Sequence, residues 1–162
     1  MDKLWAPWRI NYIQTIPENK KCIFCEALSA ENENDRYLLL KTEHSLVMLN
    51  IYPYNNGHLL VAPRRHTGNI QELSAQEHLD IMSTSSKMIG ILKKVLNPDG
   101  FNLGLNLGKS GGAGIAEHLH MHIVPRWTGD TNFMSTCSDT KIISQSLKES
   151  FNQLKQCLNE TT

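Results

Sequence analysis

Three histidines at alternate positions constrain this chain more than any other feature of its sequence. His118, His120 and His122 are separated by single apolar residues and are followed by Ile-Val-Pro. In a β-strand, successive side chains point to opposite faces of the sheet. The spacing therefore predicts a strand over residues 117–125 that has three imidazoles on one face and a core-facing apolar side on the other.

The same alternation limits the chemistry that these histidines can do. With a rise of roughly 3.3 Å per residue, neighbouring histidines stand about 7 Å apart and the outer two about 13 Å apart. One metal ion therefore cannot easily bind all three, although His118 and His120 could share one with a ligand from elsewhere. A neutral imidazole is also a competent nucleophile at neutral pH. Two interpretations stay open on this evidence, a nucleophilic histidine and a catalytic metal.

A glycine-rich loop, residues 108–114, lies just before the histidines and follows Asn106. Glycines let backbone N–H groups approach a phosphate closely, which makes Gly108, Ser110 and Gly112 candidate phosphate contacts. The segment is not a P-loop, because its Gly-Lys-Ser lacks the earlier glycine of that motif and no helix follows. Its position beside an imidazole-lined strand favours a phosphate-bearing ligand.

Short apolar runs elsewhere predict four more strands, and three segments predict helices. A capping box at Ser74 opens the longest helix, and we expect its apolar side to carry Leu79, Met82 and Ile89. Runs of strands indicate an α+β fold with a mostly antiparallel sheet of about five strands, one long helix packed on it and a C-terminal helix. The expected strands cover 37–41, 45–49, 58–62 and 101–107, and the expected helices cover 22–29, 74–96 and 138–159.

Length, charge and hydropathy restrict the class of protein. A chain of 162 residues suits one domain, so we treat 1–162 as a single unit with residues 1–21 as an N-terminal arm. Lys plus Arg and Asp plus Glu each number 16, and no basic run appears, which argues against nucleic-acid binding. The sequence has no signal peptide and no apolar run of about 20 residues, so we expect a cytoplasmic protein without a membrane partner.

Two of the four cysteines, Cys22 and Cys25, form a Cys-x-x-Cys pair. In a reducing compartment this spacing indicates either a metal site or a redox pair. No thioredoxin-like βαβ pattern surrounds the pair, which favours a metal. A tetrahedral zinc site needs two further ligands, which the spacing alone does not identify.

The run His118-Leu-His120-Met-His122-Ile-Val resembles the motif of the histidine-triad (HIT) family, in which three histidines alternate with apolar residues. The resemblance extends to the Cys-x-x-Cys, the Asn-Gly before His58, the long helix and the glycine-rich loop. The opening Leu-Trp-Ala-Pro-Trp-Arg and the stretch from Val-Pro-Arg-Trp to Asn-Phe-Met are similar to the branch that contains bacterial diadenosine tetraphosphate phosphorylases and hydrolases.

This resemblance implies a HIT-like fold and a catalytic role for each histidine of the motif. His120 would attack the α-phosphorus of a nucleotide and form a nucleotidyl-histidine intermediate. His122 would contact the phosphate or assist the leaving group, and His118 would orient the nucleophile. The acceptor in the second step names the reaction, because water gives a hydrolase and inorganic phosphate gives a phosphorylase.

The resemblance also implies binding residues and a cofactor. Asn50 would face the ribose hydroxyls, while His58 and Asn106 would lie near the phosphates. Zinc-bearing relatives combine the Cys-x-x-Cys with two histidines, which implies a structural zinc ion held by Cys22, Cys25, His66 and His118. Four protein ligands would leave no open position for water.

Several alternatives remain at this point. The leading hypothesis is cleavage of dinucleoside polyphosphates such as diadenosine tetraphosphate, and the others are a nucleoside phosphoramidate hydrolase, a zinc metallohydrolase using His118 and His120, and a non-catalytic nucleotide-binding module. Many family members carry Gln or Ser just before the triad, where this chain has Gly-Ala-Gly-Ile-Ala-Glu. That difference favours phosphate over water as the acceptor. Relatives generally form homodimers or larger homo-oligomers, and the aromatic arm packs either on its own domain or on a partner subunit.

Overall fold

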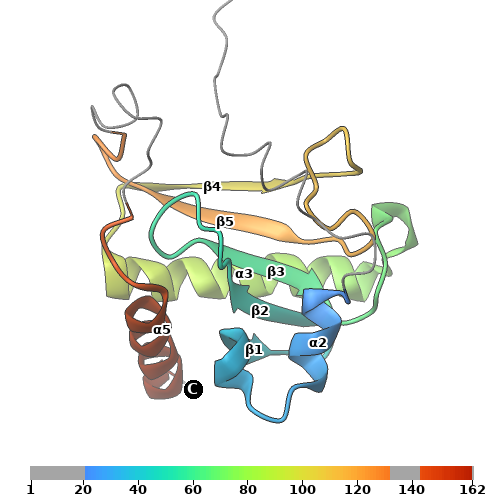
Figure 1. The fold of residues 1–162 in the computed structure, drawn as a ribbon, viewed down its shortest axis with the longest axis horizontal. Helices are drawn as coiled ribbons and strands as arrows, with labels where there is room; N and C mark the ends of the chain where they lie inside the picture. The colour runs from blue at the N-terminus through green and yellow to red at the C-terminus, as the bar shows by residue number, and fades with distance from the viewer. Residues whose placement is uncertain (1–20, 132–142, 162) are drawn as a thin grey trace, which may run out of the picture.

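The computed structural model describes residues 21–131 and 143–161. Its centre is a five-stranded sheet in the order β1-β2-β3-β5-β4, and every neighbouring pair is antiparallel (Figure 1). This arrangement confirms the predicted α+β class. The strands are β1 (Leu38–Lys41), β2 (Ser45–Leu49), β3 (Leu59–Pro63), β4 (Gly100–Leu105) and β5 (Met121–Arg126).

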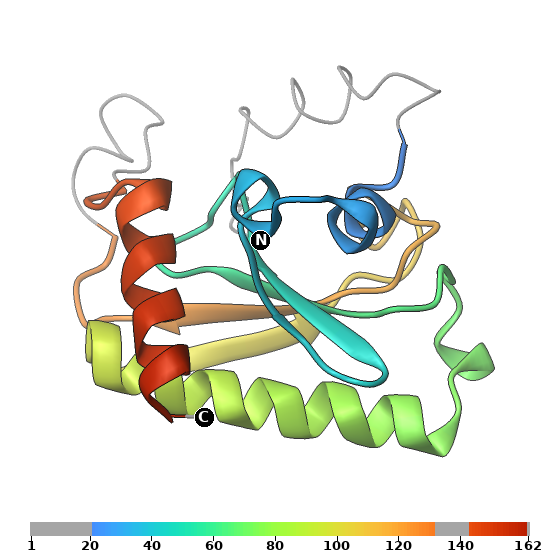
Figure 2. The ribbon, with the colours of Figure 1, turned by 90° about the horizontal axis from the view of Figure 1, so that it is seen from below.

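Helices cover both faces of this sheet. The long helix α3 (Ala75–Leu96) runs along one face, and the short helix α2 (Ile23–Ser29) lies on the other (Figure 2). Helix α5 (Leu147–Thr161) packs across one end of α3. Two short 3₁₀ helices, η1 (Glu33–Arg36) and η2 (Ile70–Glu72), precede β1 and α3.

Strands β2 and β3 are apolar at nearly every position because both of their faces are covered. Val47 and Leu49 point into the main core, which lies between the sheet and helices α3 and α5. Leu46 and Met48 point into a smaller core that contains Phe24 of α2. A strand buried on both faces reads as a continuous apolar run, which is how these segments appear in the sequence.

Helix α3 begins where the capping box predicts, but of the three residues expected on its apolar side only Ile89 packs against the core. The Ser74 hydroxyl accepts from the backbone N–H of Glu77, and the Glu77 carboxylate accepts from the backbone N–H of Ser74. Leu79 is 71% exposed and Met82 is 54% exposed, whereas both were expected in the core. The buried side instead carries Glu77, Ile81, Thr84, Ser85, Met88, Ile91 and Leu92.

Hydrogen bonds explain why polar residues occupy the buried side of α3. The hydroxyl of Thr84 lies 3.4 Å from that of Ser45, and the hydroxyl of Ser85 donates to the carbonyl of Ile81. A buried polar group that finds a partner costs little free energy. Apolar periodicity therefore selects the wrong face, because it counts these satisfied polar residues as exposed.

The predicted element ends also need correction. Helix α5 begins at Leu147 and residues 143–146 are not helical, so the predicted start at residue 138 is too early. The hydroxyl of Ser146 accepts from the backbone N–H of Glu149, as an N-cap residue does. Strand β4 covers Gly100–Leu105 instead of 101–107. The arm, apart from Lys21, lies outside the described residues, and none of the described helices could cross a membrane.

An ion pair fixes the connection between β3 and α3. The guanidinium of Arg65 donates from Nε and Nη2 to the two carboxylate oxygens of Glu77, each at 3.0 Å, and Nη2 also donates to the carbonyl of Glu72. These bonds from Arg65, together with the backbone N–H of Ser74, lower the pKa of Glu77 to about 2. The connection that carries His66 is thereby tied to the first turn of α3.

We predict that Glu77→Gln lowers the free energy of unfolding by about 1–2 kcal/mol near neutral pH. The folded pKa of Glu77 lies below its unfolded value of about 4.3. The carboxylate therefore stabilises the fold fully above the unfolded pKa, and this contribution is lost as the pH falls through about 2. Urea denaturation at several pH values should show the two proteins converging in stability with acid. A difference in unfolding free energy that stays constant down to pH 2 would contradict this account.

Candidate active site and metal centre

The histidine run enters the sheet later than its alternation predicts. Strand β5 begins at Met121, so His118 and His120 precede the strand and only His122 lies within it. The backbone N–H of Leu119 donates to the carbonyl of Thr67, 2.7 Å away in the connection after β3, instead of to a neighbouring strand. The predicted strand over 117–125 is therefore wrong in its first four residues, because β3 pairs with this segment only as far as Val61 and Met121, although β3 itself continues to Pro63.

The division of the run into two sides is confirmed despite this later start. Leu119 and Ile123 are buried in the main core. The rings of His120 and His122 lie on the other side of the run, with centroids 5.0 Å apart. They are closer than the 7 Å or so expected for an extended strand. The ring of His118 turns away toward α2 and the connection after β3.

His120 is held in a neutral form with one free lone pair. Its Nδ1 lies 2.8 Å from the backbone carbonyl of His118. A carbonyl oxygen can only accept, so Nδ1 carries the proton and Nε2 keeps its lone pair. Burial lowers the pKa of His120, with 6% of the residue exposed, and its ring packs against Phe24. A neutral imidazole with an available Nε2 is a nucleophile at neutral pH.

His122 forms a pair with His58 beside the ring of His120. Nε2 of His58 is 2.9 Å from Nδ1 of His122, and both rings contact the ring of Tyr54. His58 is completely buried, and this burial together with the neighbouring His122 and His120 lowers its pKa to about 3. His58 is therefore uncharged at neutral pH.

The two predicted asparagines also reach the histidines. Nδ2 of Asn50 lies 3.3 Å from Nδ1 of His58. Nδ2 of Asn106 lies 3.5 Å from Nε2 of His122 and 3.4 Å from the carbonyl of Gly112. The fold thus brings both asparagines to the His58–His122 pair, although they are 56 positions apart in the sequence.

The glycine-rich loop contributes less than its composition suggests. Gly108 and Gly112 adopt left-handed φ angles of 69° and 86°, which glycine allows. The N–H groups of Gly112 and Ala113, however, donate within the loop to the carbonyls of Lys109 and Gly108. The predicted phosphate contact Ser110 is exposed on this loop. The hydrogen-bond donors for a phosphate must therefore be backbone N–H groups at other positions of the loop, or side chains.

Four side chains converge on a second cluster. The ligand atoms of Cys22, Cys25, His66 and His118 all lie within 4.8 Å of one another. Individual separations are 3.2 Å from Cys22 Sγ to His118 Nδ1, 3.3 Å from Cys25 Sγ to His66 Nδ1, and 3.2 Å between the two Nδ1 atoms. Tetrahedral ligands around a zinc ion lie roughly 3.3–3.8 Å apart, so this spacing suits such an ion.

His118 is oriented for ligation by its outer nitrogen. Nε2 of His118 lies 2.8 Å from the carbonyl of Pro63, so Nε2 donates and Nδ1 directs its lone pair into the cluster. A metal-bound histidine is usually held this way through its second nitrogen. Because His118 faces this cluster while Nδ1 of His120 is bonded to a carbonyl, the two histidines do not converge on one ion. The arrangement disfavours the metallohydrolase hypothesis.

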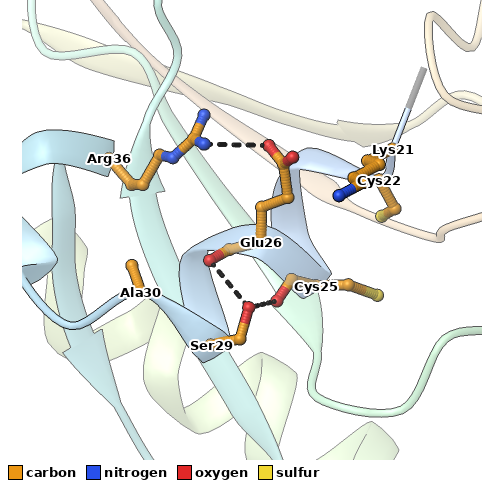
Figure 3. A pocket seen from close by; sticks show the side chains of 7 residues that line it. All are labelled: Lys21, Cys22, Cys25, Glu26, Ser29, Ala30 and Arg36. Carbon is orange, nitrogen blue, oxygen red and sulfur yellow. Dashed lines mark hydrogen bonds and ion pairs between the residues drawn. The ribbon is translucent and has the colours of Figure 1, made fainter.

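The cysteines of this cluster border a surface pocket on α2 (Figure 3). The pocket is lined by Lys21, Cys22, Cys25, Glu26, Ser29, Ala30 and Arg36. Glu26 and Arg36 form an ion pair of 3.1 Å, and both sulfur atoms point away from it. Solvent therefore reaches the cysteine side of the cluster.

Comparison with known proteins identifies the family. Residues 31–129, more than half of the chain, match the family model described as HIT domain. The chain belongs to the HIT domain family. A protein named AP-4-A phosphorylase from Mycobacterium tuberculosis is 37% identical over 157 residues, covering 92% of this chain and 80% of that protein. A bis(5'-adenosyl)-triphosphatase from Dictyostelium discoideum is 30% identical over 55% of this chain and 59% of its own length.

A solved HIT structure shares the fold. A zinc-bound histidine triad family protein from Mycobacterium smegmatis aligns with a TM-score of 0.69 and 25% identity, covering 86% of this chain and 94% of that one. These comparisons confirm the resemblance drawn from the histidine run. They also confirm the predicted HIT-like fold, an antiparallel sheet of five strands with helices.

Some residues of this HIT site escape prediction from the sequence. Phe24 packs against both His118 and His120, with ring centroids 4.8 and 5.1 Å away. Tyr54 covers the His58–His122 pair. The signal for Phe24 is its place inside the Cys-x-x-Cys, and Tyr54 lies in a Pro-Tyr-Asn-Asn-Gly run that reads only as a turn.

Proposed function

We propose that this HIT protein cleaves dinucleoside polyphosphates, such as diadenosine tetraphosphate, through a nucleotidyl-histidine intermediate on His120. The observation that carries the proposal is the neutral His120, anchored through Nδ1 and left with a lone pair on Nε2 beside His122. The names of two relatives, AP-4-A phosphorylase and bis(5'-adenosyl)-triphosphatase, support this substrate class.

The reaction proceeds in two balanced steps. Nε2 of His120 attacks the α-phosphorus, the P–O bond to the bridging oxygen breaks, and the leaving nucleotide departs with the electron pair. Water or inorganic phosphate then attacks the same phosphorus, the P–N bond breaks, and His120 regains its lone pair. Splitting the transfer in this way replaces one difficult displacement by two easier ones.

The neighbouring residues assist this chemistry. His122 and Asn106 act at the phosphoryl and leaving oxygens, where a fixed donor stabilises developing negative charge. Asn50 faces the ribose, and His58 supports His122 from behind. The loop residues Gly108, Ser110 and Gly112 contribute the remaining wall around the phosphates.

We further propose that the four-residue cluster holds a structural zinc ion. The two thiols and two imidazoles are a zinc-type donor set, and their separations suit tetrahedral ligation. A zinc-bound relative supports the assignment. When bound, zinc would join α2, the connection after β3 and the segment before β5, which fixes the backbone carbonyl that holds His120.

Two further proposals concern the cellular compartment and the oligomeric state. Among the described residues, Cys22, Cys25 and Cys157 form no disulfide, which supports a reducing compartment such as the cytoplasm. Among the described strands, β4 is at the edge of the sheet and carries an exposed Leu103. An apolar edge strand is a natural place for a second copy to pair, and on this basis we propose a homodimer or a larger homo-oligomer.

We predict that His120→Ala lowers kcat on diadenosine tetraphosphate by at least about 10³-fold, because the nucleophile is removed. Binding of AMP, measured by calorimetry, should change little, since the other contacts remain. His78→Ala, an exposed position on α3, is the matched control and should keep full activity. Substantial turnover by the His120 variant would exclude the covalent mechanism.

The products with and without inorganic phosphate test the acceptor. We expect phosphate-dependent formation of ADP together with ATP from diadenosine tetraphosphate, because the segment before the triad lacks a side chain that would position water. Chromatography of the nucleotides distinguishes this from hydrolysis, which yields AMP and ATP. A rate indifferent to phosphate, with AMP as a product, would identify a hydrolase.

We predict that Cys22→Ser and Cys25→Ser lower the bound zinc and the melting temperature, because each removes one of four ligands. Atomic emission measures the zinc, and thermal unfolding with and without a chelator measures its contribution. Cys157→Ser on α5 is the matched control, which should keep its bound zinc and still lose melting temperature when the chelator is added. Removal of zinc without any change in melting temperature would argue against a structural role.

A further inference from the structure

We infer that the backbone N–H of Tyr54, with the amide of Asn50 beside it, sets where the proton of His122 lies and thereby favours leaving groups that depart as anions. The inference deepens the function proposed above and rests on it for its kinetic part. It starts from the hydrogen bonds between the loop over residues 50–57 and the His58–His122 pair.

The first step fixes the tautomer of His58. The backbone N–H of Tyr54 lies 3.0 Å from Nδ1 of His58, and the amide Nδ2 of Asn50 approaches the same nitrogen at 3.3 Å. A backbone N–H can only donate. Nδ1 of His58 is therefore an acceptor, and the proton of the neutral ring is on Nε2.

The second step carries this constraint to His122. Nε2–H of His58 points at Nδ1 of His122 over 2.9 Å, so this Nδ1 accepts. The proton of a neutral His122 must then be on Nε2. The amide nitrogen of Asn106, 3.5 Å from this Nε2, then donates to the carbonyl of Gly112 and not to His122. His122 thus presents an N–H donor next to the nucleophile.

The third step shows that the pair has no place for an additional proton. Both acceptor nitrogens, Nδ1 of His58 and Nδ1 of His122, already face a fixed donor. His122 can therefore stabilise negative charge by hydrogen bonding, but it cannot give up its proton without becoming an anion. A nucleotide phosphate leaves as a stable anion and needs no proton. An amine leaving from a phosphoramidate needs one, because amines are protonated at neutral pH.

The loop that supplies these donors is rigidly anchored. The buried side chain of Asn55 donates to the carbonyl of Pro125 at 3.1 Å and to the carboxylate of Asp130 at 2.8 Å. Gly57 adopts a φ of 69°, and a Cβ there would lie 2.4 Å from a side-chain carbon of Leu96. The direction of the Tyr54 N–H is therefore built into the fold.

At position 50, the hydrogen bonding of His58 can be changed without a change in the size of the side chain. The amide of Asn50 offers N–H to His58, while its oxygen accepts from the backbone N–H of Tyr52. A carboxylate of the same size would accept instead of donate at Nδ1 of His58. It would favour a protonated His58, which could pass its Nε2 proton to His122 as His122 protonates a leaving amine.

The test compares wild type, Asn50→Asp and Asn50→Ala by long-range ¹H–¹⁵N correlation spectra of the histidine rings. We expect His122 to be the Nε2–H tautomer in wild type and in Asn50→Ala, where the Tyr54 N–H remains. In Asn50→Asp, His58 should be protonated or carry its proton on Nδ1. Asn102→Asp is the matched charge control, because its oxygen can still accept from Arg126, and it should leave the spectra unchanged.

Kinetics supply the second measurement. The ratio of kcat/KM on adenosine 5'-phosphoramidate to that on diadenosine tetraphosphate should rise about tenfold or more in Asn50→Asp and stay unchanged in Asn50→Ala. A wild-type His122 with its proton on Nδ1, or identical histidine spectra in wild type and Asn50→Asp, would overturn the inference. If wild type cleaves neither substrate but the spectra are as expected, the proposed function fails and the leaving-group preference with it, while the tautomer assignment stands.

Discussion

His118 joins three parts of the molecule through three different atoms, and the rest of the site depends on it. Its Nε2 donates to the carbonyl of Pro63 at the end of β3. Its Nδ1 faces the cysteines of α2. Its backbone carbonyl accepts the Nδ1 proton of His120 and so leaves the lone pair of that ring on Nε2. In the proposed mechanism, the middle histidine of the motif attacks phosphorus, and it keeps Nε2 available because the first histidine fixes its Nδ1.

The two faces of the sheet have different roles, since one carries the main core and the other carries the candidate site. The face under α3 carries most of the apolar core, and Leu119 and Ile123 anchor the histidine run in it. The opposite face carries α2 with Phe24, the cysteine–histidine cluster and the reactive imidazoles. The histidine run lies between these two faces and alternates polar and apolar residues, so its apolar side chains pack in the core while its imidazoles face the candidate site.

Much of this arrangement follows from sequence patterns, and the exceptions have physical causes. The alternating histidines predict the correct sides but not the start of β5, because the backbone N–H of Leu119 bonds to Thr67 in the connection after β3 and not to β3 itself. The buried side of α3 is missed because Thr84 and Ser85 form hydrogen bonds that periodicity does not count. His66 and His118 join the cysteines only through tertiary folding, so a family resemblance had to point to them. The proton positions in the His58–His122 pair depend on the direction of one backbone N–H, which no composition or spacing encodes.

The separations between the residues of the cysteine–histidine cluster bear on how the chain reaches its native state. Cys25 and His66 are 41 positions apart, and His66 and His118 are 52 apart. Closing loops of this length costs the chain entropy, and no single helix or hairpin brings these ligands together. Strands β1 to β3, α3 and β4 all lie within these loops, so the cluster closes around most of the sheet and the long helix. An ion bound there would tie the ends of both loops together and slow the unfolding of the native chain.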